Sequence, residues 1–284
     1  MKLLQIAGRD FRLAAVCYWL LPMLLCSILG FAQNIPEPPP NPINFLLQSL
    51  RREAQTNLRG EVRELQVFPP RQVPEQIRPE MPAPPPLLPA QLRKNYLVTA
   101  ELGESIAGRQ TWRIQLQPKN NNAASYTIWI DQKWLLRLGT QERDPNGEVV
   151  YSARFIRLNT PNLRQQPRQL NLLEPSPKLQ RFVETQTGLL LPEGFLVFEI
   201  RPRTVGKNNL AALEVRASNG MGVLVLVFTS IGTANTPRIV SRKVGRAFVW
   251  VIGNLRRAEL ERSAASIVGN LNLDALLSSF GALR

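Results

Sequence analysis

The sequence predicts an α+β protein of two domains, each built on an antiparallel sheet. Stretches in which apolar and polar residues alternate recur along the chain, and such alternation is typical of half-buried strands. Turn-forming residues separate these stretches. The clearest are Asn146-Gly147 and Asn219-Gly220, because asparagine and glycine readily take the positive φ of a hairpin turn. Proline-rich and polar segments divide the alternating stretches into two groups.

The first group, which begins at Tyr96, predicts a meander of about five antiparallel strands with one packed face and one wetter face. After the strand that starts at Tyr96, further strands are expected at residues 111–117, 126–131, 134–138 and 149–158. Ahead of the meander, apolar residues recur at helical spacing over 43–57, which predicts a helix. A strand is expected to follow it at residues 60–68.

The segments before this helix and after this strand are rich in proline. Residues 36–42 are proline-rich and are expected to form an extended spacer. The insert at residues 69–90 contains Pro84, Pro85 and Pro86. It cannot supply a central strand, because proline has no N–H to donate to a neighbouring strand.

The second group follows a polar, proline-bearing linker, predicted at residues 159–188, and spans residues 189–269. Strands are expected at 196–203, 210–217, 221–228 and 248–252, and the nearly all-apolar stretch 221–228 is expected to be central. Asn254 is a candidate N-cap for a helix over 255–268. The tail, residues 270–284, has apolar residues that could pack back or bind a partner, and a loosely docked tail is the simpler interpretation. These residues are Leu273, Leu276, Leu277 and Phe280.

The first 32 residues have the pattern of an export signal. Lys2, Arg9 and Arg12 precede a long apolar run, and Gly30-Phe31-Ala32 places small residues where a signal peptidase cuts. An uncleaved anchor is the alternative, because the run approaches the length of a membrane span. Cleavage after Ala32 is favoured, which predicts a periplasmic or other extracytoplasmic location.

Composition excludes much catalytic chemistry. The chain has no histidine, and its two cysteines, Cys17 and Cys26, lie inside the predicted signal. A mature chain without either residue type has neither a zinc site of cysteine and histidine nor a serine or cysteine nucleophile paired with histidine. The carboxylates at the ends of the predicted strands show no pairing pattern in sequence. No enzyme activity, cofactor or metal is therefore predicted.

The formal net charge of +14 is strongly positive. No nucleic-acid recognition motif accompanies it, and export would separate the chain from nucleic acid. An anionic membrane surface or an acidic partner segment explains the charge better. Scattered surface charge that keeps the chain soluble is the other explanation.

Several motifs occur together in one order. Ala107-Gly108-Arg109 precedes a strand, a second strand contains Trp129-Ile130-Asp131, and the turn at 144–147 follows. Farther along stand a Leu-Pro-x-Gly-Phe motif at 191–195 and a turn at 244–246. This order resembles the MucB/RseB family of periplasmic regulators of sigma-factor signalling.

The resemblance implies an incomplete LolA-like half-barrel at residues 33–158, followed by the smaller sheet-plus-helix domain. The chain departs from the family where the proline-rich insert 69–90 replaces several strands. This departure bears on whether the half-barrel still encloses a lipid cavity.

The resemblance also implies a function. Such proteins are accessory regulators that bind the periplasmic segment of an anti-sigma factor. For this chain we predict stronger binding to a protein segment than to lipid, with strand addition at an exposed sheet edge as one route. The alternative is a LolA-like carrier or sensor of lipids or lipoprotein acyl chains. An apolar cavity would then be lined by Trp112, Trp129, Trp134 and Phe155, with Trp129 foremost because it faces away from Ile128 and Ile130. Core packing is the simpler role for each of these four residues.

Overall fold

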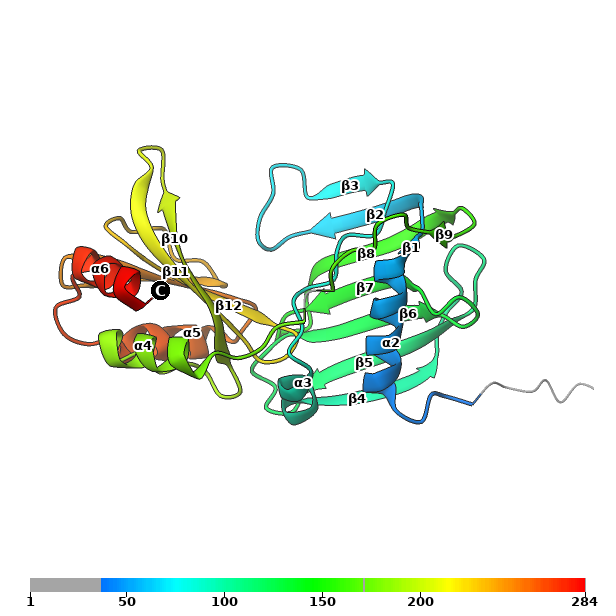
Figure 1. The fold of residues 1–284 in the computed structure, drawn as a ribbon, viewed down its shortest axis with the longest axis horizontal. Coiled ribbons are helices and arrows are strands. Elements are labelled where there is room, and N and C mark those ends of the chain that lie inside the picture. The colour runs from blue at the N-terminus through cyan, green and yellow to red at the C-terminus, as the bar shows by residue number, and fades with distance from the viewer. Residues whose placement is uncertain (1–36, 171, 284) are drawn as a thin grey trace, which may run out of the picture. The chain divides into compact units, whose positions relative to one another are not determined.

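The computed structural model describes residues 37–170 and 172–283. The predicted signal peptide, residues 1–32, lies outside this described part. Two antiparallel sheets of seven and five strands, together with a separate two-stranded sheet, make up the strands of the described chain (Figure 1). Five helices accompany them there. The predicted α+β class is confirmed.

The seven-stranded sheet has the order β3-β2-β8-β7-β6-β5-β4, with every pair antiparallel. Five consecutive strands, β4 to β8, form the predicted meander. The strands are β2 (Gly60–Gln66), β3 (Glu75–Arg78), β4 (Tyr96–Leu102), β5 (Thr111–Pro118), β6 (Ser125–Asp131), β7 (Arg137–Arg143) and β8 (Val149–Leu158).

The turn between β7 and β8 forms where Asn146-Gly147 predicts it. The Asp144 carboxylate accepts hydrogen bonds from the backbone N–H groups of Asn146 and Glu148 at 2.9 and 3.0 Å, and Gly147 has a φ of +87°. The prediction of a strand at 134–138 is wrong, because β7 begins only at Arg137. The Asp131 carboxylate accepts bonds from the backbone N–H groups that follow it, and these bonds hold residues 132–135 in a turn.

Helix α2 (Pro42–Gln55) lies across one face of this sheet, which we call the α2 face (Figure 1). Asn41 starts the helix, since its side-chain oxygen accepts a bond from the backbone N–H of Asn44 at 3.0 Å. Leu46, Leu47 and Leu50 are buried against the sheet. Burial of leucines at this spacing is the main source of helix stability.

The insert 69–90 contributes an edge strand and a crossing segment to the first domain. Its β3 has four residues and pairs only with β2, as expected for a proline-rich stretch. Residues 79–86, which we call the proline strap, then lead to Leu87 and Leu88, both 1 % exposed. Helix α3 (Pro89–Asn95) follows and runs into β4. The small sheet pairs β1 (Thr56–Asn57) with β9 (Asn162–Leu163).

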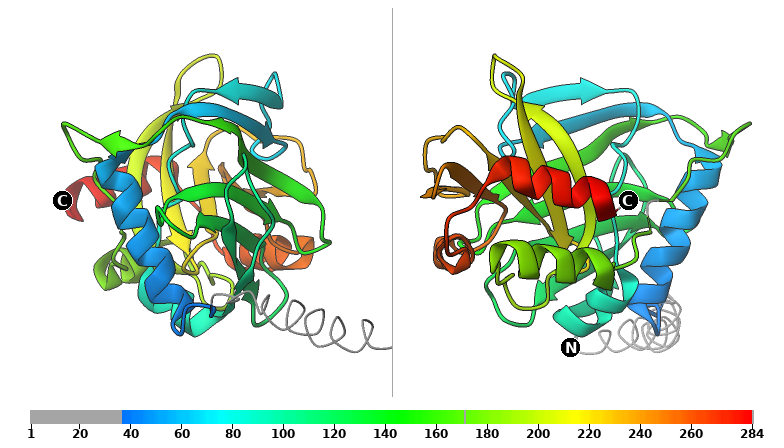
Figure 2. Two further views of the ribbon diagram at one scale, coloured as in Figure 1. Left: turned by 90° about the vertical axis from the view of Figure 1, so that its right-hand side faces the viewer. Right: turned by 60° about the vertical axis from the view of Figure 1, so that its left-hand side comes forward.

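The five-stranded sheet has the order β10-β11-β12-β14-β13, which places the apolar β12 at its centre as predicted. Helices α4, α5 and α6 cover one face and share a core with it (Figure 2). We call the other face, which carries no helix of this core, the open face. The elements are β10 (Leu196–Val205), β11 (Leu210–Ser218), β12 (Val223–Thr229), β13 (Ile239–Val244), β14 (Ala247–Ile252), α4 (Pro177–Thr187), α5 (Arg257–Ser266) and α6 (Leu273–Leu283).

Several elements differ from the expectations. Residues 177–187, inside the predicted linker, form α4, whose Val183 is 2 % exposed. Asn254 does not cap α5, which begins at Arg257; its amide instead donates to the Glu142 carboxylate. The tail is a helix, α6, with Leu276 and Phe280 buried in the core, so the loosely docked tail is wrong. The domain boundaries themselves stay predictions.

Candidate functional site

The α2 face of the seven-stranded sheet has an apolar half and a polar half. On β5 and β6, Ile114, Leu116 and Ile128 pack against the leucines of α2. On β2 and β7, the same face carries the polar Glu64 and Thr140, which the register places on either side of Ala153 of β8. The proline strap covers this polar half.

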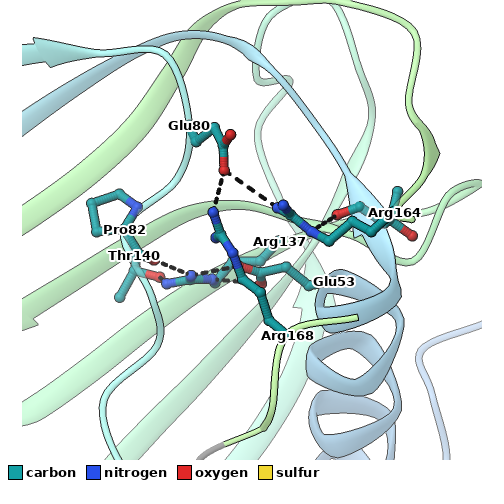
Figure 3. A network of polar contacts seen from close by, with 8 residues as sticks. Glu53, Glu80, Pro82, Arg137, Thr140, Arg164 and Arg168 are labelled. Carbon is teal, nitrogen blue, oxygen red and sulfur yellow. Dashed lines mark hydrogen bonds and ion pairs between the residues drawn. The ribbon is translucent and has the colours of Figure 1, made fainter. Parts of the chain in front are cut away.

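Arg137 anchors the proline strap and α2 to the sheet (Figure 3). Its side chain is 2 % exposed, and its guanidinium donates two bonds to the Glu53 carboxylate, at 2.7 and 3.0 Å. It also donates to Thr140 Oγ1 at 3.1 Å and to the carbonyl of Pro82. Burial alone lowers the pKa of Arg137, but the paired Glu53 raises it overall. The arginine is therefore a charged clamp between three segments.

Glu80 ties the strap to the segment after the meander. Its carboxylate accepts a bond from Arg164 at 3.3 Å and a second from Arg168 (Figure 3). It also lies 3.4 Å from Arg59 Nε. Burial works to raise the pKa of Glu80, but the hydrogen bonds and charges of the two arginines lower it overall. These contacts place one carboxylate among three arginines at the rim of the strap.

A hollow of about 280 Å³ lies beside the strap on the polar half of the α2 face. Within it, Tyr126 Oη donates to the Glu142 carboxylate at 3.2 Å. Burial raises the pKa of Glu142, and that of Tyr151 to about 12. The lining residues are Glu64, Gln66, Phe68, Pro69, Arg71, Pro82, Ala83, Pro85, Tyr126, Arg137, Thr140, Glu142 and Tyr151. Such a lining suits a ligand that forms hydrogen bonds better than a long acyl chain.

A second hollow, of about 400 Å³, lies on the open face of the five-stranded sheet and shares five residues with the first. We call it the arginine groove. Its lining comprises Phe68, Pro69, Pro85, Pro86, Tyr126, Glu142, Arg201, Arg203, Glu214, Arg216, Met221, Val223, Val225, Ile252 and Asn254.

Three arginines surround one buried carboxylate in this groove. Glu214 is 1 % exposed, and Arg201 and Arg216 approach it at 2.8 and 3.1 Å, with Arg203 also in contact. The side chains of Arg201 and Arg203 are each 45 % exposed. Glu199 lies 3.2 Å from Arg216 as well. Three arginines therefore face two carboxylates in this cluster, and Arg201 and Arg203 still face solvent. Such a surplus attracts anionic groups.

Apolar strands lie directly beside the arginines. The register aligns Arg216 of β11 with Val225 of β12, and Val225 with Ile252 of β14. One row of the open face thus runs from charged to apolar side chains. An amphipathic segment with acidic residues on one side matches this arrangement.

The four aromatic residues predicted to line an apolar cavity do not share either hollow. Trp112 belongs to the core under α2. Phe155 is 2 % exposed and lines a cavity of only about 10 Å³.

The other two residues are Trp129 and Trp134, and the backbone carbonyl of Trp134 accepts a bond from Arg52 of α2 at 2.9 Å. Trp129 pairs with Gly139 on the opposite face, with the Arg154 guanidinium 5.7 Å from its ring. The Arg109 guanidinium lies 3.6 Å from the ring of Trp134. A ligand-binding role for these four residues stays a prediction.

Sequence reasoning missed the arginines of β10 and β11. The alternation Glu199-x-Arg201-x-Arg203 is visible in the sequence, and it places all three side chains on one face of a strand. In the described residues there is no cluster of three potential metal ligands. The described helices include none that is both long and apolar enough to cross a membrane.

Comparisons with known proteins agree with the resemblance. Residues 49–175 match the family model of the MucB/RseB N-terminal domain. No curated protein matches the chain in a sequence search.

Solved structures share the fold. A crystal structure of MucB in complex with MucA(peri) covers 82% of this chain and 100% of its own, with a TM-score of 0.55 at 14% identity. A complex structure of Pseudomonas aeruginosa MucA/MucB covers 81% and 99%, with a TM-score of 0.56 at 14% identity. A crystal structure of MucB covers 80% and 98%, with a TM-score of 0.52 at 14% identity.

Proposed function

Because residues 49–175 belong to the MucB/RseB family of N-terminal domains, we propose that this protein is an exported accessory regulator of sigma-factor signalling. In this role it binds the periplasmic segment of an anti-sigma factor and restrains its proteolysis. Two of the similar structures hold MucB bound to MucA, which supports a binding role rather than a catalytic one.

The arginine groove is the observation that carries this proposal. It is open to solvent, it has more arginines than partner carboxylates on β10 and β11, and it borders the apolar residues of β12 and β14. Charged groups at a rim guide association, and apolar contacts beside them supply affinity. An acidic, amphipathic stretch of the anti-sigma segment is the expected occupant.

The test is the affinity for a synthetic anti-sigma periplasmic segment, taken from a candidate gene that neighbours a sigma factor. Arg203→Gln is expected to weaken binding about three- to tenfold and to reduce its salt dependence. Arg257→Gln is the matched control. Arg257 is similarly exposed, at 46 % against 45 % for Arg203, and its partner Glu261 lies on α5. Equal effects of the two variants, or no binding by the unaltered protein, would contradict the proposal.

Export is tested separately. The charged start, the apolar run and Gly30-Phe31-Ala32 predict a mature chain that begins after Ala32. N-terminal sequencing of the protein from the periplasmic fraction is expected to find this start. Intact Met1 on a cytoplasmic chain would overturn export.

Lipid carriage is the alternative that the resemblance implies. Extraction of the purified protein is expected to release little acyl lipid, because the polar half of the α2 face is hydrogen-bonding and covered by the strap. Trp129→Ala tests the predicted aromatic site, since it would reduce any bound lipid and spare segment binding. Stoichiometric lipid without segment binding would favour the carrier over the regulator.

A further inference from the structure

The seven-stranded sheet ends at β4, and this end lacks the usual protection of a sheet edge. Its residues, Tyr96–Leu102, include no proline, and their one charged side chain, Glu101, is neutralised by Arg113 of β5. Leu97 and Leu102 are 61 % and 47 % exposed. Edge strands present unpaired backbone groups, and natural proteins usually blunt them with charges, prolines or short length.

The other three ends of the two larger sheets carry such protection. At the far end of the same sheet, β3 has only four residues, and Pro74 and Pro79 border it. In the second sheet, β10 contains Pro202 between two arginines. The last end, β13, contains Arg242, which donates to backbone carbonyls beyond the end of α5 and within it. Among these four ends, β4 is the unprotected one.

The backbone of β4 offers a row of free groups. Gly103 N–H donates to the Thr111 carbonyl, and Lys119 N–H donates to the Asn95 carbonyl, both at 2.9 Å. Antiparallel pairs alternate between bonded and non-bonded residues, and the register is continuous between these two points. The N–H and C=O groups of Val98, Ala100 and Leu102 therefore point away from β5. In the part of the chain that the structure describes, no hydrogen bond reaches them.

Charge is uneven along this edge. Arg93, Lys94 and Lys119 gather at the start of β4, where Lys119 Nζ lies 2.8 Å from the Lys94 carbonyl. None of the three forms an ion pair within the described residues. Toward the other end, Glu101 is already paired with Arg113 at 2.8 Å. The start of the strand can therefore attract a carboxylate.

We propose that β4 accepts an extended segment of a partner protein as an eighth, antiparallel strand. Apolar residues alternate in this segment and continue the packing of Val98 and Ala100 beside α2. An acidic residue near its C-terminal end meets Arg93, Lys94 and Lys119. The site is separate from the arginine groove and does not depend on the proposed regulatory function.

The probe is a labelled synthetic peptide of alternating threonine and valine that ends in two glutamates. It is prepared in three forms: unmodified, methylated on the valine backbone nitrogens, and methylated on the threonine backbone nitrogens. A strand uses one set of its N–H groups for pairing with one neighbour. One methylated form is therefore expected to lose binding at least tenfold, and the other to keep it.

Hydrogen exchange on the unaltered protein locates the contact. The amides of Val98, Ala100 and Leu102 are expected to exchange fast in the free protein and slowly with the peptide bound. Those of Leu97 and Thr99 are expected to be slow in both states. Ala100→Pro, which removes the central outward N–H, is expected to weaken binding about tenfold, and Arg203→Gln to leave it unchanged.

Three outcomes overturn the proposal. The exchange rates of these amides do not change when the peptide is added, both methylated peptides lose binding equally, or Arg203→Gln weakens peptide binding as much as Ala100→Pro does. Slow exchange that appears without peptide as protein concentration rises would also overturn it, because a second copy of the chain would then occupy the edge. Since the hydrogen-exchange measurement needs no variant, the result stands even if Ala100→Pro fails to fold.

Discussion

Glu142 is one of the five residues that line both hollows, and its partly buried carboxylate forms no ion pair within the described residues. Tyr126 and Asn254 donate hydrogen bonds to the same oxygen of this carboxylate. Burial raises the pKa of Glu142, while these bonds and the charge of Arg238 lower it by less. The folded chain therefore binds a proton here more tightly than the unfolded chain does.

This difference predicts how stability depends on pH. Where the folded state binds more protons, the free energy of unfolding falls as pH rises. Ionised Glu142 lowers the free energy of unfolding. This loss is absent below the ordinary pKa of glutamate, where the carboxyl group is protonated in both states, and it is complete above the raised pKa. Glu142→Gln keeps a carbonyl acceptor without the charge. We expect this variant to be more stable than the unaltered protein at pH 8, and the difference to shrink toward pH 4.

Urea unfolding at a series of pH values measures the effect. Glu148→Gln is a suitable control, because the Glu148 side chain is 71 % exposed and contacts the same Arg238. A stability difference for Glu142→Gln that stays constant from pH 4 to pH 8 would contradict the assignment of a raised pKa.

At the scale of elements, alternation and continuous apolar runs predicted most of the strands, and both signals failed where charge interrupts them. The strands β5, β6, β8, β11, β12 and β14 fall within a few residues of their predicted bounds. Strand β13 was missed, because Ser241, Arg242 and Lys243 leave few apolar positions in it. The helical spacing of Leu273, Leu276 and Phe280 was present in the sequence. Periodicity cannot show whether such a face finds a partner surface.

Helix α6 supplies a prediction at this scale. Phe280 is 4 % exposed, and its ring centroid lies 6.0 Å from that of Phe182 on α4. Phe280→Ala is expected to lower the free energy of unfolding by about 3–5 kcal/mol. Ser278→Ala, at an exposed position of the same helix, is expected to change it by less than about 0.5 kcal/mol. Denaturant unfolding followed by circular dichroism compares the two, and similar small losses would show that the tail is dispensable.

The candidate site was largely beyond sequence reasoning, because it depends on contacts between distant segments. Arg137 and Glu53 are 84 residues apart, and only the packing of α2 on the sheet brings them together. The arginine groove depends on the register of β10, β11 and β12. Core packing was the simpler role predicted for each tryptophan, but periodicity does not show whether an apolar ring lines a cavity or fills a core.

At the scale of the whole molecule, polar contacts join the two sheets within residues 39–284. The hairpin between β11 and β12 meets α3 and the start of β4. Leu88 N–H donates to the Gly220 carbonyl at 3.1 Å, and Tyr96 Oη bonds to Asn219 Oδ1 at the same distance. Asn95 Nδ2 donates to the Asn219 carbonyl at 2.8 Å. Hydrogen bonds demand closer geometry than apolar contacts, so this joint tolerates little displacement.

Gly220 is the residue on which this joint depends most. Its φ is +120°, and a Cβ built on it would lie 2.4 Å from the backbone nitrogen of Leu92 and 2.6 Å from its Cα. Alanine at this position therefore brings both an unfavourable φ and a clash with the backbone of α3. We expect Gly220→Ala to lower the free energy of unfolding by about 2–5 kcal/mol.

Gly147→Ala measures how much stability is lost through an unfavourable φ alone, without a clash. Gly147 has a φ of +87°, and no atom lies within 4 Å of a Cβ built there, so the loss is expected to be about 1–2 kcal/mol. Because Gly220→Ala separates the hairpin from α3, it is also expected to speed limited proteolysis between residues 160 and 176, which Gly147→Ala leaves unchanged. Equal losses of stability in the two variants, with equal cleavage rates, would mean that the hairpin does not hold the two sheets together.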